Sequence, residues 1–288
     1  MAKKVAIVTG ANRGLGLEIL RQLLQSEKFQ GDVYLTSRMT DKGREAAKTL
    51  EQYGLNPCFH ELDITQPGSI RMFEEHLVSK YGGVDIIINN AAVTYTKEEK
   101  VPLFRQAQLS MGTDFKGTLN MCRIFWPHIR PHGRIVLLTN GYIANKNVLG
   151  SKILERLNGK DVTFHTLITL MDEYMKAVQH GLQANFGWPE SPSQIAKIFI
   201  VELAKILCKN LQGDRRQNVL VNACCPGWTQ TDGSKMYMDD DGLCNGERPS
   251  SVSESAKDVV WLATLPPGTS NMNGLLVRHR HVIDPTAE

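Results

Sequence analysis

A glycine-rich segment near the amino terminus has the residue types needed to hold a pyrophosphate. Its residues are Thr9-Gly10-Ala11-Asn12-Arg13-Gly14-Leu15-Gly16. The glycines allow a tight turn and a close backbone approach, and the positive amino-terminal end of the helix predicted to follow attracts an anion. The GxxxGxG spacing differs from the commonest fingerprint, GxGxxG, but the segment lies between a predicted strand and a predicted helix. It therefore predicts a dinucleotide site; the alternative is a purely structural turn.

Two arginines bear on which dinucleotide is bound. Arg13 lies inside the glycine-rich segment, and Arg38 ends the sequence Thr36-Ser37-Arg38 after the second apolar run. NAD enzymes place an acidic residue at this point to bind the ribose 2′-hydroxyl, and this chain has none there. Two guanidinium groups can hold a 2′-phosphate through charge-assisted hydrogen bonds. The cofactor predicted is NADPH, and the alternative is a pair of solvated surface arginines.

Apolar runs that alternate with helical patterns must position this segment. The strands are expected at Val5–Thr9, Val33–Thr36, Cys58–Leu62, Val84–Asn89, Arg134–Leu138, Val219–Ala223 and Gly274–Val277. The helices are expected at 14–26, 42–53, 67–80, 103–129, 192–211 and 252–264. Runs such as Ile86-Ile87-Ile88 suit parallel strands with helices on both faces. The alternation predicts an α/β fold with a doubly wound, seven-stranded parallel sheet, the Rossmann fold.

The residues from Asn140 to Pro192 interrupt this alternation. They contain one helical pattern, Leu167, Leu170, Tyr174 and Val178. A loop of that length without its own structure is uncommon. We therefore expect a helical insertion at about 141–190, before the helix that carries Lys197. Repeats and linkers are absent from the sequence, so residues 1–288 are expected to form one domain.

Composition and charge narrow the class of protein. The 288 residues are 42% hydrophobic and 22% charged, enough apolar material for one core. The net charge of +3 is spread along the chain, which argues against nucleic acid or a membrane surface as partner. The apolar run Val5–Val8 is too short for a signal peptide or a membrane span, so a cytoplasmic protein is expected. The six cysteines have no CxxC spacing and no accompanying histidine pair, so no metal site is predicted.

Three further motifs, together with the glycine-rich segment, resemble the short-chain dehydrogenase/reductase family. Leu62-Asp63-Ile64 is similar to the family's adenine-binding turn, and Asn89-Asn90-Ala91-Ala92 to its Asn-Asn-Ala-Gly motif. Pro226-Gly227, followed by Trp228, comes where the family holds the nicotinamide. By resemblance, Asp63, Ile64, Asn90, Pro226, Gly227 and Trp228 join the glycine-rich segment, Arg38 and Lys197 as cofactor-binding candidates.

Within that family the chain most resembles the monomeric cytosolic carbonyl reductases. The shared motifs are Tyr81-Gly82-Gly83, Gly187-Trp188-Pro189, Asn222-Ala223-Cys224-Cys225-Pro226-Gly227-Trp228 and Leu265-Pro266-Pro267. An insertion also falls at the same place, and the resemblance covers essentially the whole chain. It implies a monomer that uses NADPH to reduce a small-molecule carbonyl or quinone.

The family reduces carbonyl groups with an Asn-Ser-Tyr-Lys tetrad. In it, tyrosine donates the proton and serine holds the carbonyl oxygen. Lysine lowers the tyrosine pKa and binds the nicotinamide ribose, while asparagine positions a water. Lys197 matches the lysine, but Ser193 stands at the tyrosine position. Asn140 stands at the serine position and Asp114 at the asparagine position, so three of the four have changed.

These replacements have different physical consequences. Asn140 still offers an N–H donor to a carbonyl oxygen, and Asp114 adds a charge that could pair with Lys197. Ser193 is the serious change, because its hydroxyl is shorter in reach and a far weaker acid than a phenol of pKa ~10. Losing a positioned acid costs about 10²–10⁴-fold in rate. Turnover is therefore predicted to be weak or lost.

Other side chains could serve as a substitute donor. Tyr142 matches a position that lines the carbonyl reductase pocket, and Tyr95 and Tyr174 are further candidates. For each of them, a pocket-wall or surface aromatic is the favoured interpretation. Tyr95-Thr96-Lys97 and Gln106 fall where carbonyl reductases contact glutathione conjugates, but with different residues.

Two functions remain open at this stage. One is an NADPH-dependent carbonyl reductase with a remodelled proton relay, and the other is an NADPH-holding protein that acts through ligand or partner binding. A different redox reaction through Cys225 is a third possibility; the alternative for Cys225 is an inert pocket residue.

Overall fold

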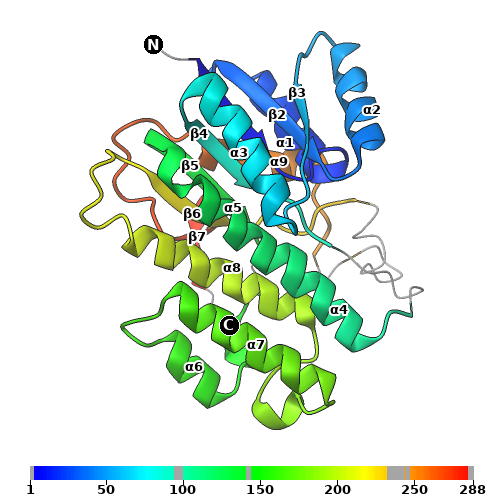
Figure 1. Cartoon of the computed structure of the whole chain (residues 1–288), viewed down its shortest axis with the longest axis vertical. Coiled ribbons are helices and arrows are strands. Elements are labelled where there is room, and N and C mark those ends of the chain that lie inside the picture. The colour runs from blue at the N-terminus through cyan, green and yellow to red at the C-terminus, as the bar shows by residue number, and fades with distance from the viewer. Residues whose placement is uncertain (1–2, 94–99, 141–143, 232–242, 244–246, 285–288) are drawn as a thin grey trace.

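The strands of the computed structural model form one sheet in the order β3-β2-β1-β4-β5-β6-β7-β8 (Figure 1). The structure describes residues 3–93, 100–140, 144–231, 243 and 247–284. The strands are β1 (Lys4–Val8), β2 (Gly31–Ser37), β3 (Cys58–Glu61), β4 (Val84–Asn89), β5 (Ile129–Leu138), β6 (Leu220–Cys224), β7 (Leu276–Arg278) and β8 (His281–Val282). The first seven run parallel, and β8 pairs antiparallel with β7. The predicted doubly wound α/β fold is confirmed.

The strand count differs from the prediction of seven by the short strand β8. The chain turns back after β7 through His279 and Arg280, whose φ angles are 50° and 62°. Two successive residues with positive φ are typical of a tight hairpin turn, and Asn-Gly is the usual sequence for it. The His-Arg pair gives no such signal, so the eighth strand was missed.

Helices cover both faces of the sheet. One face carries α1 (Gly14–Leu24), α2 (Thr40–Glu51) and α9 (Val252–Ala263). The other carries α3 (Pro67–Tyr81), α4 (Leu103–Ser110), α5 (Thr118–Phe125) and α8 (Pro192–Lys209). In β1, Ala6 and Val8 pack in the core on the α1, α2 and α9 face, and Val5 and Ile7 pack in the core on the opposite face. Side chains alternate along a strand, so a strand buried on both faces needs an unbroken apolar run.

The single helix predicted over 103–129 is wrong in detail. The chain passes from α4 into a π-helix, η1 (Met111–Gly117), then into α5 and a short 3₁₀ turn, η2 (Trp126–His128). A π-helix has i→i+5 hydrogen bonds, which widen the helix locally, and it is frequently found at functional sites. Here it places Asp114 beside α8.

The described part of the predicted insertion contains the α-helices α6 (Ser151–Leu157) and α7 (Phe164–Gln179) and the short 3₁₀ turns η3 (Lys146–Val148) and η4 (Ala184–Phe186). Helix α7 packs against α4 and α8, and both insertion helices lie below α8 in Figure 1. The two ends of the insertion meet where the Gly150 N–H donates to the Gly187 carbonyl at 2.8 Å. A Cβ added to either glycine would lie within 3 Å of the other's Cα, so the contact requires glycine on both sides.

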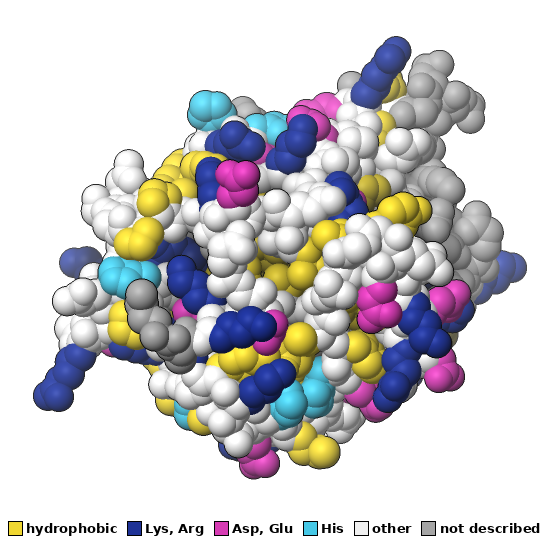
Figure 2. All heavy atoms as spheres, turned by 90° about the horizontal axis from the view of Figure 1, so that it is seen from above, with side chains coloured by type: hydrophobic (Ala, Val, Ile, Leu, Met, Phe, Trp, Pro, Cys, Tyr) yellow, Lys and Arg dark blue, Asp and Glu magenta, His cyan; other side chains and the backbone are white. Residues whose placement is uncertain are grey.

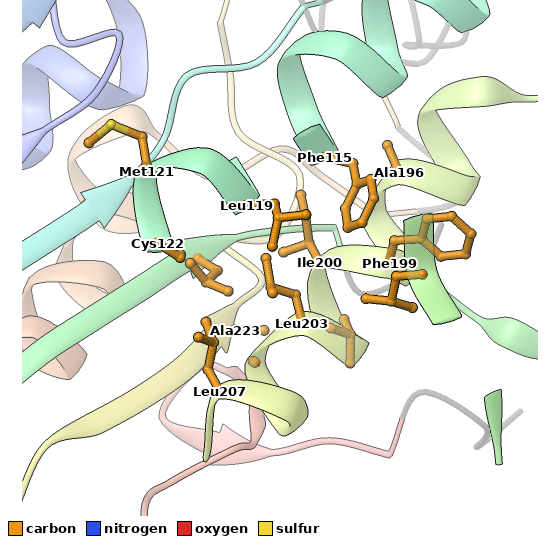
Figure 3. Packing of buried hydrophobic residues seen from close by; sticks show 14 of the residues in the cluster. Phe115, Leu119, Met121, Cys122, Ala196, Phe199, Ile200, Leu203, Leu207 and Ala223 are labelled. Carbon is orange, nitrogen blue, oxygen red and sulfur yellow. The ribbon is translucent and has the colours of Figure 1, made fainter. Parts of the chain in front are cut away.

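An apolar layer joins the π-helix to α8. Phe115 and Leu119 face Phe199, Ile200 and Leu203 in Figure 3. The rings of Phe115 and Phe199 meet edge to face with centroids 5.1 Å apart. This packing fixes the spacing between Asp114, next to Phe115, and Lys197, two residues before Phe199. Among the helices described, none is long and apolar enough to cross a membrane.

Candidate functional site

The glycine-rich segment forms the turn between β1 and α1. Gly10 and Gly14 have φ angles of 62° and 56°, which a residue with a side chain rarely adopts. Helix α1 begins at Gly14, with no side-chain cap at Arg13 and no acidic residue in its first turn. Its first N–H groups therefore keep their capacity to bind an anion. This arrangement fits the pyrophosphate of a dinucleotide.

Asn90 shapes this turn from the neighbouring strand. Its Nδ2 donates to the carbonyl oxygens of Thr9 at 2.9 Å and Gly10 at 3.2 Å. A Cβ on Gly16 would lie 2.4 Å from that Nδ2 and 2.7 Å from the Gly10 oxygen, so only glycine fits. Asn90 thus holds the backbone of the segment in place.

The two arginines proposed for the 2′-phosphate both lie in solvent. Arg13 and Arg38 are exposed, and neither guanidinium group forms a hydrogen bond or ion pair with any residue the structure describes. Asn12 is half-buried, and Leu15 packs its side chain against the core beneath α1. Both guanidinium groups therefore remain available to an anionic ligand.

The turn after β3 combines a polar and an apolar residue. Asp63 is half-buried, and its Oδ1 accepts hydrogen bonds from the N–H and the hydroxyl of Thr65 at 2.9 and 2.7 Å. Ile64 is buried, and its side chain packs close to Gly117 in the π-helix. Of the two, Asp63 therefore offers a carboxylate oxygen to a ligand, whereas Ile64 can offer only its backbone.

Asp114 and Lys197 form an ion pair. Lys197 Nζ lies 3.5 Å from Asp114 Oδ2, with side chains 14% and 0% exposed. The other carboxylate oxygen, Oδ1, accepts a hydrogen bond from the N–H of Val93 at 2.9 Å. The pairing expected from the sequence is present.

The environment of Asp114 acts on its pKa in two directions. Burial raises the pKa of the carboxyl, and this effect outweighs the positive charge of Lys197 and the Val93 N–H, which lower it. An amide at this position would carry no charge and would leave Lys197 unpaired. The replacement at 114 therefore changes the electrostatics around the lysine.

Helix α8 carries both Ser193 and Lys197. Ser193 is the second residue of the helix, whose cap is Ser191, and it is half-buried. Residues four apart lie on the same helix face, so the two side chains project to the same side. The Ser193 hydroxyl has no hydrogen bond to any described residue.

The end of β5 contacts α8 through Thr139. Its hydroxyl donates to the Lys197 carbonyl oxygen at 3.0 Å, and its N–H donates to the Cys224 carbonyl at 2.9 Å. Asn140 follows, half-buried, and its carbonyl accepts from the Ala144 N–H at 2.8 Å. Thr139 therefore fixes α8 against the sheet, and Asn140 is the first residue beyond the strand.

The segment after β6 lies against the glycine-rich turn. Pro226, Gly227 and Trp228 are half-buried. Thr231, which the sequence interpretation did not include, has its Cγ2 3.9 Å from where a Cβ on Gly14 would stand. Its place five residues after Pro226 was the only available signal. Thr231 joins the cofactor-binding candidates.

The substitute donors differ in what the structure says of them. Tyr142 and Tyr95 lie outside the described residues. Tyr174 is fully buried against Trp188, with ring centroids 5.5 Å apart, and burial raises the pKa of its phenol. Its interpretation as a surface aromatic is therefore wrong.

The remaining candidate residues are held by the protein itself. Gln106 donates to the Val101 carbonyl at 2.8 Å, and Cys225 is fully buried. In the part of the chain described, no three His, Cys, Asp or Glu side chains form a metal-binding cluster.

Known proteins with similar sequences and folds place the chain in a family. A family model described as short chain dehydrogenase matches residues 4–148. "Carbonyl reductase [NADPH] 1" of Rattus norvegicus is 35% identical over 97% of this chain and 98% of its own length. "Carbonyl reductase [NADPH] 3" of Homo sapiens is 36% identical over 97% of both. Salutaridine reductase from Papaver somniferum has the same fold, with a TM-score of 0.81 at 22% identity over 95% of this chain and 99% of its own. The chain therefore belongs to the short-chain dehydrogenase family and has carbonyl reductases among its homologues.

Proposed function

We propose that the chain binds NADPH at the glycine-rich turn. The first N–H groups of α1 would hold the pyrophosphate, Arg13 and Arg38 the 2′-phosphate, and Lys197 the ribose of the nicotinamide half. The uncapped start of α1 is the observation that supports this most directly. The names of two carbonyl reductase relatives include NADPH, which agrees with the proposal.

The reaction we propose is slow reduction of a carbonyl, aldehyde or quinone. Bound NADPH supplies a hydride, and the protein must hold the carbonyl and deliver a proton. The Asn140 side chain offers a donor for the carbonyl oxygen. The Asp114–Lys197 ion pair carries the conclusion that turnover is weak. It directs the lysine toward a buried carboxylate rather than toward a phenol, and Ser193 supplies no comparable acid.

Two measurements on one preparation test this proposal. An NADPH titration followed by fluorescence should give saturable binding that is tighter than binding of NADH at low salt. NADPH oxidation with a panel of quinones and aldehydes should be detectable and slow. Binding without oxidation of any substrate would remove the catalytic part, and absence of binding would remove both parts.

The second candidate is an NADPH-dependent binding protein without turnover. The same ion pair favours it, because a buried pair that persists with ligand bound would keep Lys197 from any proton relay. Such a protein would bind NADPH and a small carbonyl or quinone ligand together, and ligand affinity would depend on NADPH. Calorimetry with and without NADPH distinguishes it from an enzyme.

We also propose a cytoplasmic monomer with a small-molecule ligand. Figure 2 displays one face on which Lys and Arg side chains alternate with Asp and Glu, a pattern that does not favour nucleic acid. Helix α7 packs on α8, a surface that many members of this family use for subunit contacts. We therefore expect sedimentation at micromolar concentration to give a monomer; a dimer or tetramer would contradict this.

A further inference from the structure

The end of strand β3 lies beside the proposed 2′-phosphate position. Glu61, the last residue of β3, is in register with Ser37, the last residue of β2. The next N–H, from Leu62, donates to the Ser37 carbonyl at 3.0 Å. Arg38 follows Ser37 directly. The main chains of Glu61 and Arg38 are thus neighbours at the carboxyl ends of β3 and β2.

The Glu61 side chain is directed toward the start of α2. The Thr40 hydroxyl donates to Glu61 Oε2, and Thr40 is the first residue of α2. Phe59, on the same face of the strand, packs against Gly43 one turn further along that helix. The carboxylate therefore lies at the segment Arg38–Thr40.

No cation neutralises this carboxylate within the described part of the chain. Glu61 is exposed, and it makes no ion pair with Arg38 or with any other described residue. The carboxyl ends of β2 and β3, which offer Arg38 to an anion, therefore also present a negative charge that has no ion-pair partner among the described residues.

We infer that Glu61 limits the preference of this chain for NADPH over NADH. The inference rests on the proposed NADPH binding and names a residue that sets its specificity. A phosphate monoester carries about −1.5 to −2 charges near pH 7, so the Glu61 carboxylate repels it. The ribose of NADH has an uncharged 2′-hydroxyl, which is not repelled. Arg13 and Arg38 attract the 2′-phosphate, and Glu61 offsets part of that attraction.

The test measures dissociation constants of NADPH and NADH for wild type and Glu61→Gln by fluorescence titration at low salt. Glutamine keeps an oxygen that accepts from Thr40, so the local structure is preserved. We expect the variant to bind NADPH about three- to tenfold more tightly, an effect that shrinks as salt is added. NADH binding should stay within about twofold.

The matched control is Glu51→Gln, which removes an exposed carboxylate at the far end of α2. It should leave both dissociation constants unchanged. If Glu61→Gln leaves NADPH binding unchanged, or tightens NADH binding equally, or is matched by Glu51→Gln, the inference is wrong. Wild type that binds no NADPH would instead overturn the proposed function on which the inference rests.

Discussion

The glycine-rich turn and the face of α8 that carries Ser193 and Lys197 both lie at the carboxyl ends of the parallel strands. Their structures depend on different parts of their residues. The turn is built from backbone: a side chain at Gly16 would overlap Asn90 and the Gly10 carbonyl. The α8 face is built from side-chain ends, and Ser193 occupies its position half-buried within an intact helix. A change in the turn disturbs the fold, whereas a change on α8 can remove an acid and leave the packing unaltered. Under the proposed function, cofactor binding at the turn would therefore persist while proton transfer at α8 differs.

The most direct test of this comparison restores the family's side chains at the three replaced tetrad positions and changes nothing else. In the triple variant Ser193→Tyr, Asn140→Ser and Asp114→Asn, a phenol stands one helical turn from Lys197 and the competing carboxylate is gone. We expect quinone or aldehyde reduction at least about 10²-fold faster than wild type, the contribution of one positioned acid. Steady-state NADPH oxidation measures it. Residues that act as a unit are not additive, so the triple variant is the fair test.

Two outcomes of that experiment would contradict the comparison. A triple variant that binds NADPH normally and stays inactive would mean that the pocket itself has diverged, which supports the binding protein. Efficient wild-type turnover that collapses in Tyr142→Phe would mean that Tyr142 supplies the proton and the relay has moved rather than been lost.

A smaller effect is expected on cofactor affinity, which depends on the glycine-rich turn and the two arginines. Arg38→Asp replaces an exposed cation, unpaired among the described residues, with an anion where the 2′-phosphate is proposed to lie. NADPH affinity should fall about tenfold or more at low salt, because a charge-assisted contact is replaced by repulsion, while NADH affinity changes little. Titration of both cofactors measures this. Equal wild-type dissociation constants, or a variant without effect, would show that the arginines do not select the cofactor.

The smallest effect concerns stability. Because burial raises the Asp114 pKa in the folded protein, the fold binds that proton more tightly than the unfolded chain does. The contribution of Asp114 to the stability of the wild type therefore falls as pH rises from about 4, near the unfolded pKa of Asp, toward the higher folded value. Asp114→Asn lacks this titration, so its stability relative to wild type should increase over the same pH range. Urea unfolding at several pH values measures the difference; a constant difference would show that Lys197 fully offsets the burial.

The sequence predicted those parts of the fold that depend on repeated local patterns. Strands such as Val84–Asn89 were recognisable because burial on both faces requires an apolar run, and α3 because Pro67 marks its start. The break at Met111–Gly117 was missed, because a π-helix depends on packing between α4, α5 and α8 rather than on composition. The turn at His279 and Arg280 was missed because its conformation opposes the preference of its residues.

For the site, the sequence revealed identities better than contacts. The pairing of Asp114 with Lys197 followed from opposite charges at two matched positions. The bond from Thr139 to the Lys197 carbonyl and the contact of Thr231 with the glycine-rich turn join residues far apart in the chain. Periodicity and motif spacing carry no information about such long-range contacts.

The hydrogen bond between Gly150 and Gly187 has a consequence for how this chain can change length. The residues between Gly150 and Gly187 begin and end at nearly the same point. The helices between them therefore contribute no strand to the sheet and do not change the order of its strands. Doubling the length of such a loop costs only about 0.6 kcal/mol in closure entropy. Residues can therefore be gained or lost in the exposed turn at 158–161, between α6 and α7, with little strain on the sheet. Insertions and deletions tolerated there would alter the cover over α8 while the cofactor turn keeps its shape.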